Sequence, residues 1–358
     1  MTEGSRGCWW GEKHSCTFCG LNGIIKTYRA KTPERIADEL EYLTGRYGNQ
    51  TIFFSDNIMS REAEIELPEL LRGRKEKMHL FTEIKSNLND SDVKALSEAG
   101  FFQLQPGIES LSDPVLKLMN KGNTAICHIA LLKYAEKYSV RLAWNILYGF
   151  PGEKTEAYEE LCELIPLIEH LPSPTGGMNR IAYHRNSVYV NDPEKYSLEL
   201  KPDPMYDFYL PDDEQYINDY AYAFVDHSPQ NEQYKHTVYG KVRDMITHWQ
   251  NSFIREHKIR LDMIVFENSI EIHDSRSVRV KDSYEFEGLP KDIYLLCNEP
   301  KSHHTIISAL TEKNYSEDEI DKCLKELQDL KLLLKIRDEF LALAVERPGD
   351  YMFRWMFQ

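Results

Sequence analysis

The sequence contains no run of about eighteen apolar residues, and no apolar signal segment follows Met1. We therefore expect no membrane-spanning segment and no membrane partner. Basic residues are also outnumbered, since 43 Lys and Arg stand against 58 Asp and Glu, for a net charge of −15. Phosphate binding needs a basic face, so we expect no general nucleic-acid partner, whereas a small cofactor or a basic peptide is compatible with this charge.

A paired cysteine framework is likewise absent. Four of the seven cysteines are scattered singly, which favours a reducing environment and predicts a cytoplasmic location. The other three, Cys8, Cys16 and Cys19, form the pattern C-x7-C-x2-C. Their proximity in sequence predicts a single metal centre.

The number of thiols in this pattern has a chemical meaning. Four cysteines usually hold an iron–sulfur cluster, so three would leave one iron open for a further ligand. The alternative is a zinc site, for which His14 is close enough to be the fourth ligand. Spacing alone leaves both interpretations open.

The residues around these cysteines resemble a known family. The segment 7–14 (GCWWGEKH) precedes the segment 16–23 (CTFCGLNG). This stretch resembles the radical S-adenosylmethionine (SAM) enzymes, and more specifically the cobalamin-type radical SAM proteins that mature ribosomally made peptides. The resemblance covers most of the chain, more weakly after about position 190.

The resemblance implies cofactors and roles. Cys8, Cys16 and Cys19 would hold a [4Fe–4S] cluster whose open iron takes the amino and carboxylate groups of SAM. One electron, from a flavodoxin- or ferredoxin-like donor, would cleave SAM to methionine and a 5'-deoxyadenosyl radical. Phe18 matches the aromatic position near the adenine, and ordinary core packing is its alternative role.

Strand and helix patterns alternate after the cysteines. We expect strands over 51–54, 78–84, 101–105 and 140–147, one more within 179–190, and a short one at 2–6. We expect one helix to begin at Thr32-Pro33 and another at Asp90, and further helices over about 67–75, 113–138 and 155–171. Pro166 predicts a kink or an early end in the last of these. This alternation predicts an α/β fold with a parallel sheet. A partial (βα)6 TIM-like barrel fits it, and the resemblance implies the same fold.

Chemistry in such barrels occurs at the carboxyl ends of the strands. Polar side chains at these ends are therefore candidates for binding SAM. The resemblance places the methionyl amine at Ser55, Asp56 and Asn57. From their chemistry, Lys85 could pair with the SAM carboxylate, and Gln105 and Glu109 could bond the ribose hydroxyls. For each, a turn or a solvated loop is the alternative. The candidates are Ser55, Asp56, Asn57, Lys85, Gln105 and Glu109.

A further segment, 145–153 (NILYGFPGE), loosely resembles the family pattern G-x-I-x-G-x-x-E, whose backbone holds adenine. Asn145, Tyr148 and Gly149 are the candidates in it, although Asn145 replaces the first glycine of the pattern. Gly149 could equally serve to turn the chain.

The chain divides into four expected parts: a barrel over 1–190, an irregular and helical connector over its mouth at 191–260, a winged-helix-like domain at 261–345, and a tail at 346–358. The third helix of the winged-helix-like domain holds six acids and two bases over 316–329, which argues against DNA binding. Winged helices of peptide-maturing enzymes hold the leader peptide as an added strand, and we expect the same here, with a purely structural domain as the alternative.

These expectations lead to a functional prediction. The chain would modify an unactivated carbon of a ribosomally made precursor peptide, by C-methylation. Family members carry a cobalamin-binding domain before the cysteines, but this sequence begins seven residues before Cys8 and has no D-x-H-x-x-G motif. Cobalamin would therefore bind a separate chain, be unused, or bind a domain that a truncated sequence does not include. The alternatives are radical crosslinking or epimerisation without cobalamin, or a non-catalytic metal-binding protein that recognises peptides. No catalytic side chain is predicted.

Overall fold

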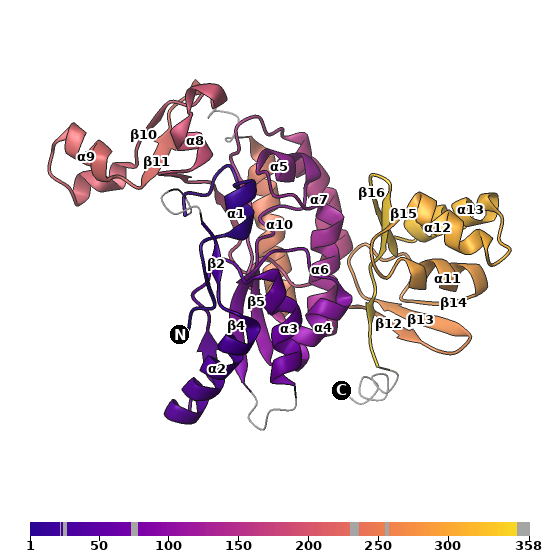
Figure 1. Cartoon of the computed structure of the whole chain (residues 1–358). Coiled ribbons are helices and arrows are strands. Elements are labelled where there is room, and N and C mark those ends of the chain that lie inside the picture. Colours follow the sequence, from indigo (N-terminus) through magenta and orange to yellow (C-terminus); the bar gives the residue numbers. More distant parts are fainter. Residues whose placement is uncertain (22, 24–26, 73–77, 230–235, 255–257, 349–358) are drawn as a thin grey trace.

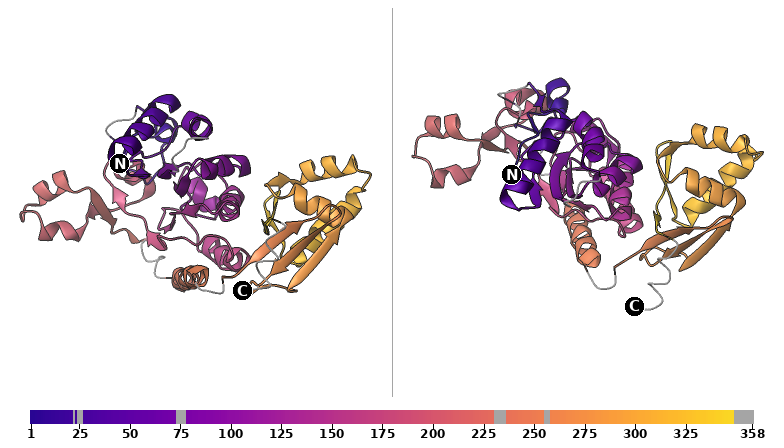
Figure 2. Two further views of the ribbon diagram at one scale, coloured as in Figure 1. Left: turned by 90° about the horizontal axis from the view of Figure 1, so that it is seen from below. Right: turned by 60° about the horizontal axis from the view of Figure 1, so that its bottom comes forward.

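The computed structural model describes residues 1–21, 23, 27–72, 78–229, 236–254 and 258–348. A central α/β part carries a small lobe on one side and a C-terminal unit on the opposite side (Figures 1 and 2). Among the described residues, no helix has the length and apolar character needed to cross a membrane.

Parallel strands form the centre of the molecule. One sheet has the order β3 (Thr51–Phe53), β4 (His79–Ile84), β5 (Phe101–Pro106) and β6 (Arg141–Leu142), and a second pairs β7 (Ile146–Tyr148) with β8 (Met178–Arg180). Two isolated parallel bridges extend them, Thr2 with Phe54 and Glu109 with Ile146. The described strands thus form two parallel sheets, where one partial (βα)6 barrel was expected.

The break in the predicted strand over 140–147 explains this difference. The backbone N–H of Trp144 donates to the Thr175 hydroxyl at 3.2 Å, and the Trp144 indole donates to the Pro172 carbonyl. The Ala143 N–H still donates to the Leu104 carbonyl of β5, whereas the Trp144 carbonyl accepts from the Gly176 N–H, so the chain turns from β5 toward the segment before β8 at Trp144. The chain therefore leaves the first sheet after β6 and enters the second at β7.

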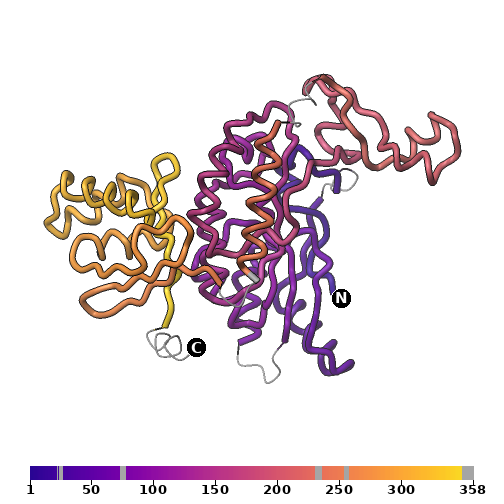
Figure 3. The backbone as a smooth tube through the Cα atoms, turned by 180° about the vertical axis from the view of Figure 1, so that it is seen from behind, coloured from indigo at the N-terminus to yellow at the C-terminus, as the bar shows by residue number. Residues whose placement is uncertain are grey.

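Seven helices of the described chain pack around these sheets (Figure 3). Thr32 caps the first of them by accepting from the Arg35 N–H, with Pro33 in the first turn as expected. Asn89, rather than the expected Asp90, caps the third, because its side chain accepts from the Asp92 N–H. The seven are α2 (Pro33–Tyr47), α3 (Arg61–Leu71), α4 (Asp90–Glu98), α5 (Asp113–Leu118), α6 (Ala125–Lys137), α7 (Glu156–Ile168) and α10 (Thr237–Ile254).

The helix expected over 113–138 is interrupted between α5 and α6. Asn120 and Gly122 have positive φ angles of 56° and 64°, which end α5. A side chain at Gly122 has no room, because its Cβ would lie 2.1 Å from the Trp10 ring. The interruption places Lys121 beside the cysteine segment.

Other helix limits differ from expectation for local reasons. Helix α7 ends at Ile168, two residues after Pro166, which cannot donate a backbone hydrogen bond. Residues 73–75, which were expected to be helical, and residues 230–235 of the expected connector lie outside the described residues. So do residues 255–257 and most of the predicted tail, 349–358.

Short elements flank the barrel-like centre. The N-terminal segment contains β1 (Ser5–Arg6), α1 (Trp9–Lys13) and β2 (Arg29–Ala30), which pairs with β1. The lobe consists of β9 (Tyr183–His184), α8 (Val188–Asn191), η1 (Glu194–Tyr196), β10 (Leu200–Pro202), η2 (Pro204–Phe208), α9 (Glu214–Tyr220) and β11 (Ala223–Asp226). This region is more regular than the expected irregular segment.

The C-terminal unit has two small sheets and three helices. One sheet has the order β14 (Ser283–Glu287), β13 (Ser269–Asp274), β12 (Leu261–Val265) and β18 (Val345–Glu346). The other has the order β15 (Lys301–Ser302), β17 (Glu339–Ala342) and β16 (Leu333–Ile336). The helices are α11 (Gly288–Leu296), α12 (His303–Thr311) and α13 (Glu317–Asp329).

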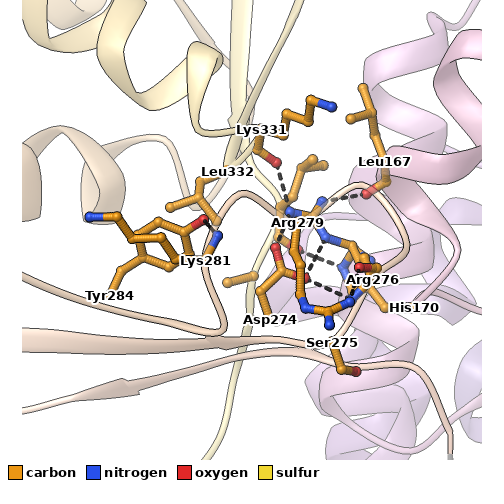
Figure 4. A network of polar contacts seen from close by, with 12 residues as sticks. Leu167, His170, Asp274, Ser275, Arg276, Arg279, Lys281, Tyr284, Lys331 and Leu332 are labelled. Carbon is orange, nitrogen blue, oxygen red and sulfur yellow. Dashed lines mark hydrogen bonds and ion pairs between the residues drawn. The ribbon is translucent and has the colours of Figure 1, made fainter.

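Buried polar contacts fix this unit to helices α6 and α7. The Lys133 ammonium donates to the Asn298 and Ala342 carbonyls and to the Asn298 side chain at 2.6–3.1 Å. The buried Arg276 guanidinium donates to the carbonyls of Leu167 and Lys331 (Figure 4). The C-terminal unit is therefore docked on the central part through groups that have lost their contact with water.

Candidate functional site

The three cysteines line one cavity of about 490 Å³. Cys8 is the N-cap of α1, where its sulfur accepts from the Gly11 N–H at 3.3 Å. The Cys19 N–H donates to the Cys16 carbonyl at 3.2 Å and closes a tight turn. All three thiols are free and half-buried. The sequence spacing therefore brings them to a single place, as predicted.

The backbone of the cysteine segment is fixed by residues at the end of α5. The Thr17 N–H donates to the Met119 carbonyl at 3.1 Å, and its hydroxyl donates to the Leu118 carbonyl at 2.9 Å. The Asn120 amide donates to the carbonyls of His14 and Ser15. The segment is thus held by protein contacts alone.

The chemistry of these thiols fits an iron–sulfur cluster. Burial raises the pKa of Cys16 to about 11 and raises that of Cys19, so bound positive charge would be needed to stabilise their thiolates. Within the described residues, no three His, Cys, Asp or Glu side chains converge closely enough to hold one ion. The His14 ring instead stacks on Trp10, with centroids 4.2 Å apart. His14 is also not among the residues that line the cavity, which counts against its expected role as a fourth zinc ligand.

Two ammonium groups and two carboxylates line the cavity beside the thiols. Lys121 forms an ion pair with Glu109 at 2.5 Å. Burial opposes the charge of Lys121, but Glu109 and Cys16 outweigh it and raise its pKa. Burial raises the pKa of Glu83. Charges of both signs therefore lie in one half-buried space, which suits a ligand that carries both signs itself.

Lys85 is the more adaptable of the two ammonium groups. Its Nζ donates to the Lys121 carbonyl at 2.7 Å and lies 3.2 Å from the centroid of the Trp10 ring. Burial, and then the charge of Lys121, lower its pKa to about 8. Attraction from Cys16, Cys8 and Glu109 opposes this shift without outweighing it.

A buried network supports the strand ends that carry these groups. His128 is fully buried, and its two ring nitrogens lie 2.8 Å from the Ser86 hydroxyl and 2.9 Å from the Ser110 carbonyl. Burial lowers the pKa of His128 to about 3, so the ring is neutral. A neutral ring donates to the Ser110 carbonyl and accepts from Ser86, which ties the segment after β4 to the segment after β5.

The structure places most of the predicted cofactor residues in the cavity wall. Those that line it are Phe18, Asn57, Lys85, Gln105, Glu109 and Asn145, together with the three cysteines. Their proposed roles toward SAM stay predictions. Phe18 belongs to the cysteine segment. The other predicted side chains come from the ends of β4 and β5, from the segment after β3, and from the gap between β6 and β7.

Four predicted residues do not line this cavity. Asp56 is buried and accepts from the Gly4 N–H and the Ser5 hydroxyl, and Ser55 is exposed, with its hydroxyl directed at the Thr2 carbonyl. The Tyr148 hydroxyl accepts from Arg243 at 3.1 Å. The Gly149 N–H donates to Glu153 at 2.9 Å. These four contribute to the surrounding framework.

Trp10 and Lys121 are two of the cavity residues that sequence reasoning missed. Trp10 was noticed only as part of the family signature, yet its ring packs on Gly122 and Lys85. Lys121 was assigned to a continuous helix. The run Asn120-Lys121-Gly122-Asn123, which is rich in turn formers, was the signal that could have found it.

Comparisons with known proteins agree on one domain. The family model of the radical SAM superfamily matches residues 2–165. An uncharacterized methyltransferase of Pyrococcus horikoshii is 30% identical over 159 residues, which cover 43% of this chain and 34% of that protein. A tRNA-2-methylthio-N(6)-dimethylallyladenosine synthase of Clostridium botulinum strain Okra is 25% identical over 174 residues, which cover 45% of this chain and 39% of that protein.

One of the solved structures compared shows the same fold. The cobalamin-dependent SAM radical enzyme OxsB, with aqua-cobalamin bound, superposes with a TM-score of 0.50 at 16% identity, over 70% of this chain and 41% of that one. The radical SAM methyltransferase TsrM from Kitasatospora setae gives a TM-score of 0.48 at 14% identity, over 69% and 50% of the two chains. The chain thus spans between a third and two fifths of the length of the two curated relatives.

Proposed function

Because the family model of the radical SAM superfamily matches residues 2–165, we propose that this protein cleaves SAM reductively and uses the resulting radical on an unactivated carbon of a ribosomally made peptide. The observation that carries the proposal is the convergence of Cys8, Cys16 and Cys19 on a half-buried cavity with charges of both signs. When bound, a [4Fe–4S] cluster supplies the electron that cleaves SAM. That electron comes from a flavodoxin- or ferredoxin-like donor.

The remaining cavity residues would bind and orient SAM. The methionyl end of SAM carries an amine and a carboxylate, and Lys85 is the ammonium group placed to pair with the carboxylate. Asn57 would receive the amine through its side-chain oxygen, and Gln105 and Glu109 would bond the ribose hydroxyls. Phe18 and Asn145 complete the wall near the adenine.

The reaction that we propose is C-methylation. The Pyrococcus relative is named a methyltransferase, and the signature around the cysteines resembles that of cobalamin-type peptide-maturing proteins. A separate cobalamin-binding chain would complete such a system. Crosslinking or epimerisation of the peptide without cobalamin is the competing reaction.

The C-terminal unit would bind the leader of the peptide. Its element order α11–β15–α12–α13–β16–β17 is that of a winged helix, and within the described residues β14 and β16 each pair on one side only. An extended peptide could add to either open edge. On adding a precursor peptide to the full-length protein, backbone amides of one edge strand should become protected from hydrogen exchange. Peptide modification without protection at either edge would contradict this role.

The central experiment is anaerobic reconstitution with iron and sulfide, followed by SAM, dithionite and hydroxocobalamin. We expect 5'-deoxyadenosine by mass spectrometry. The variant with Cys8, Cys16 and Cys19 all changed to Ala should lose iron and the product while staying folded, and Cys127→Ala, a half-buried thiol outside the cavity, should keep both. Retained SAM cleavage in the triple variant would overturn the cluster assignment.

A second readout separates the competing reactions. SAM labelled in its methyl group is incubated with the reconstituted enzyme and a defined peptide library. Labelled peptide would support methylation. Deoxyadenosine with a modified but unlabelled peptide would favour crosslinking or epimerisation, and a zinc-containing protein that yields no deoxyadenosine would indicate the non-catalytic alternative.

A further inference from the structure

An exposed aromatic and acidic surface lies on the lobe beside the cavity. We define the projecting segment as residues 200–222, which contain β10, η2 and α9 and extend away from the central part (Figure 1). Neither η2 nor α9 buries a single residue. Phe208 is 86% exposed, Tyr209 76% and Tyr220 64%. Exposed apolar area of this kind, gathered on one projection, is characteristic of an interaction site.

The charge of the projecting segment selects the kind of partner. It carries one base, Lys201, and six acids. The acids are Asp203, Asp207, Asp212, Asp213, Glu214 and Asp219. Nucleic acid and anionic lipid would be repelled by this charge, and so would a second copy of a chain whose net charge is −15.

The aromatic rings suit a cationic partner. Lys and Arg side chains bind favourably over the faces of exposed rings, and nearby carboxylates add to the attraction. The rings of Tyr216 and Tyr220 stack along one side of α9 with centroids 4.4 Å apart. An extended chain of mixed basic and apolar residues would therefore find both kinds of contact on this surface.

The projecting segment is anchored, so these rings are presented on a defined backbone. Arg185, at the end of β9, donates to the carbonyls of Asn218 and Ala221. The Tyr206 hydroxyl accepts from the N–H groups of Tyr222 and Ala223 at 3.0 and 3.1 Å. Preorganisation of this kind lowers the entropy cost of binding.

The anchor also touches the cysteine segment. A Cβ at Gly20, directly after Cys19, would lie 2.3 Å from the Arg185 carbonyl and 3.3 Å from the Tyr222 hydroxyl. Leu21, the next residue, lines the cavity and is 66% exposed. A polypeptide lying along the projecting segment would thus reach the mouth of the cavity at Leu21.

We propose that the projecting segment binds a cationic segment of the polypeptide substrate and guides it to the cavity mouth. The inference deepens the proposed function, on whose peptide substrate it rests. It assigns the recognition of lysine and arginine side chains to Phe208, Tyr209 and the neighbouring carboxylates, at a place separate from the C-terminal unit.

The test is the binding of a fluorescent peptide, in which lysine alternates with glycine and leucine, to the full-length protein by fluorescence anisotropy at about 50 mM salt. We expect Asp207→Asn/Asp212→Asn and Phe208→Ser/Tyr209→Ser each to weaken binding about tenfold. Glu62→Gln/Glu66→Gln removes two exposed charges from α3 and should bind like the wild type. All six positions are exposed, so the variants should fold normally.

The proposal would be overturned if the two variants of the projecting segment bound the lysine peptide as tightly as the α3 control variant does. It would also be overturned if the wild type bound a peptide with glutamate in place of lysine equally tightly. Deoxyadenosine formation without peptide is measured on the same samples and should be unchanged in all variants. Peptide binding without deoxyadenosine would reject the proposed function and leave the lobe assignment standing. Deoxyadenosine without peptide binding would reject the lobe assignment alone.

Discussion

Arg276 and Asp274 form a two-bond ion pair whose side chains are both fully buried. Arg276 Nε and Nη2 donate to the two oxygens of Asp274 at 2.9 and 2.7 Å, and the remaining guanidinium protons reach the carbonyls of Leu167 and Lys331. One residue thus connects α7 of the central part with β13 and the end of α13.

Arg276→Met should strongly destabilise the protein. It leaves the buried Asp274 carboxylate with only the backbone N–H of residue 276 as a donor and removes the side-chain donor of two carbonyls, a loss of about 3–5 kcal/mol in the free energy of unfolding. Arg279→Gln is the matched control, because the Arg279–Asp282 pair is exposed to solvent and contributes little to stability. Urea unfolding measures both. Similar losses in the two variants would contradict the importance of the buried pair.

Gly122→Ala should disturb the cysteine segment. Its Cβ would lie 2.1 Å from the Trp10 ring, and its φ of +64° is strained for alanine. Reduced iron content after reconstitution and a lower melting temperature are expected. Gly45→Ala is the control, since nothing lies within 4 Å of its Cβ position in α2, and it should stabilise the protein slightly. Full iron loading of Gly122→Ala would show that Trp10 moves freely.

SAM binding should depend on the protonation of Lys85. Its pKa of about 8 means that the ammonium form is present below pH 8 and is lost above it, so the affinity for SAM should fall as the pH rises through this value. Lys85→Met should weaken SAM binding about tenfold or more at neutral pH. Lys85→Arg keeps its charge at all these pH values, so its affinity should be flat with pH. An identical pH profile in Lys85→Arg and the wild type would rule out Lys85 as the titrating group.

Glu64 should make the protein less stable as the pH rises. Burial raises its pKa from 4.5 to about 7, although Arg61 opposes the shift. Between these values the folded state binds a proton that the unfolded state has lost, so stability declines by roughly 3 kcal/mol across that range. The free energy of unfolding of Glu64→Gln, relative to the wild type, should therefore increase from about pH 5 to about pH 8. A pH-independent difference would contradict the shift.

The position of the cavity could be predicted from the sequence more accurately than the side chains that line it. Parallel strands end at a common edge, and this rule brought Asn57, Lys85, Gln105 and Glu109 together as predicted. It does not tell which side chain of a turn faces inward. Asp56 faces Gly4 and Ser5 because the N-terminal segment lies beside β3, a tertiary contact that no local pattern reveals.

The periodicity of apolar residues also failed to predict two helical regions, one in which a turn interrupts the helix and one in which the helix has no buried face. The apolar pattern over 113–138 continues through Asn120 and Gly122, so the two helices looked like one. The lobe forms β10, β11 and α9 without a buried face in α9, and it therefore had no amphipathic signal to recognise.

The anchoring of the cysteine segment couples two distant stretches of the sequence. Thr17 and Asn120 fix the backbone around Cys16 by hydrogen bonds that join residues 14–17 to residues 118–120. A substitution at the end of α5 would therefore displace the cysteine turn about a hundred residues earlier in the chain, so the two stretches are expected to change together among relatives.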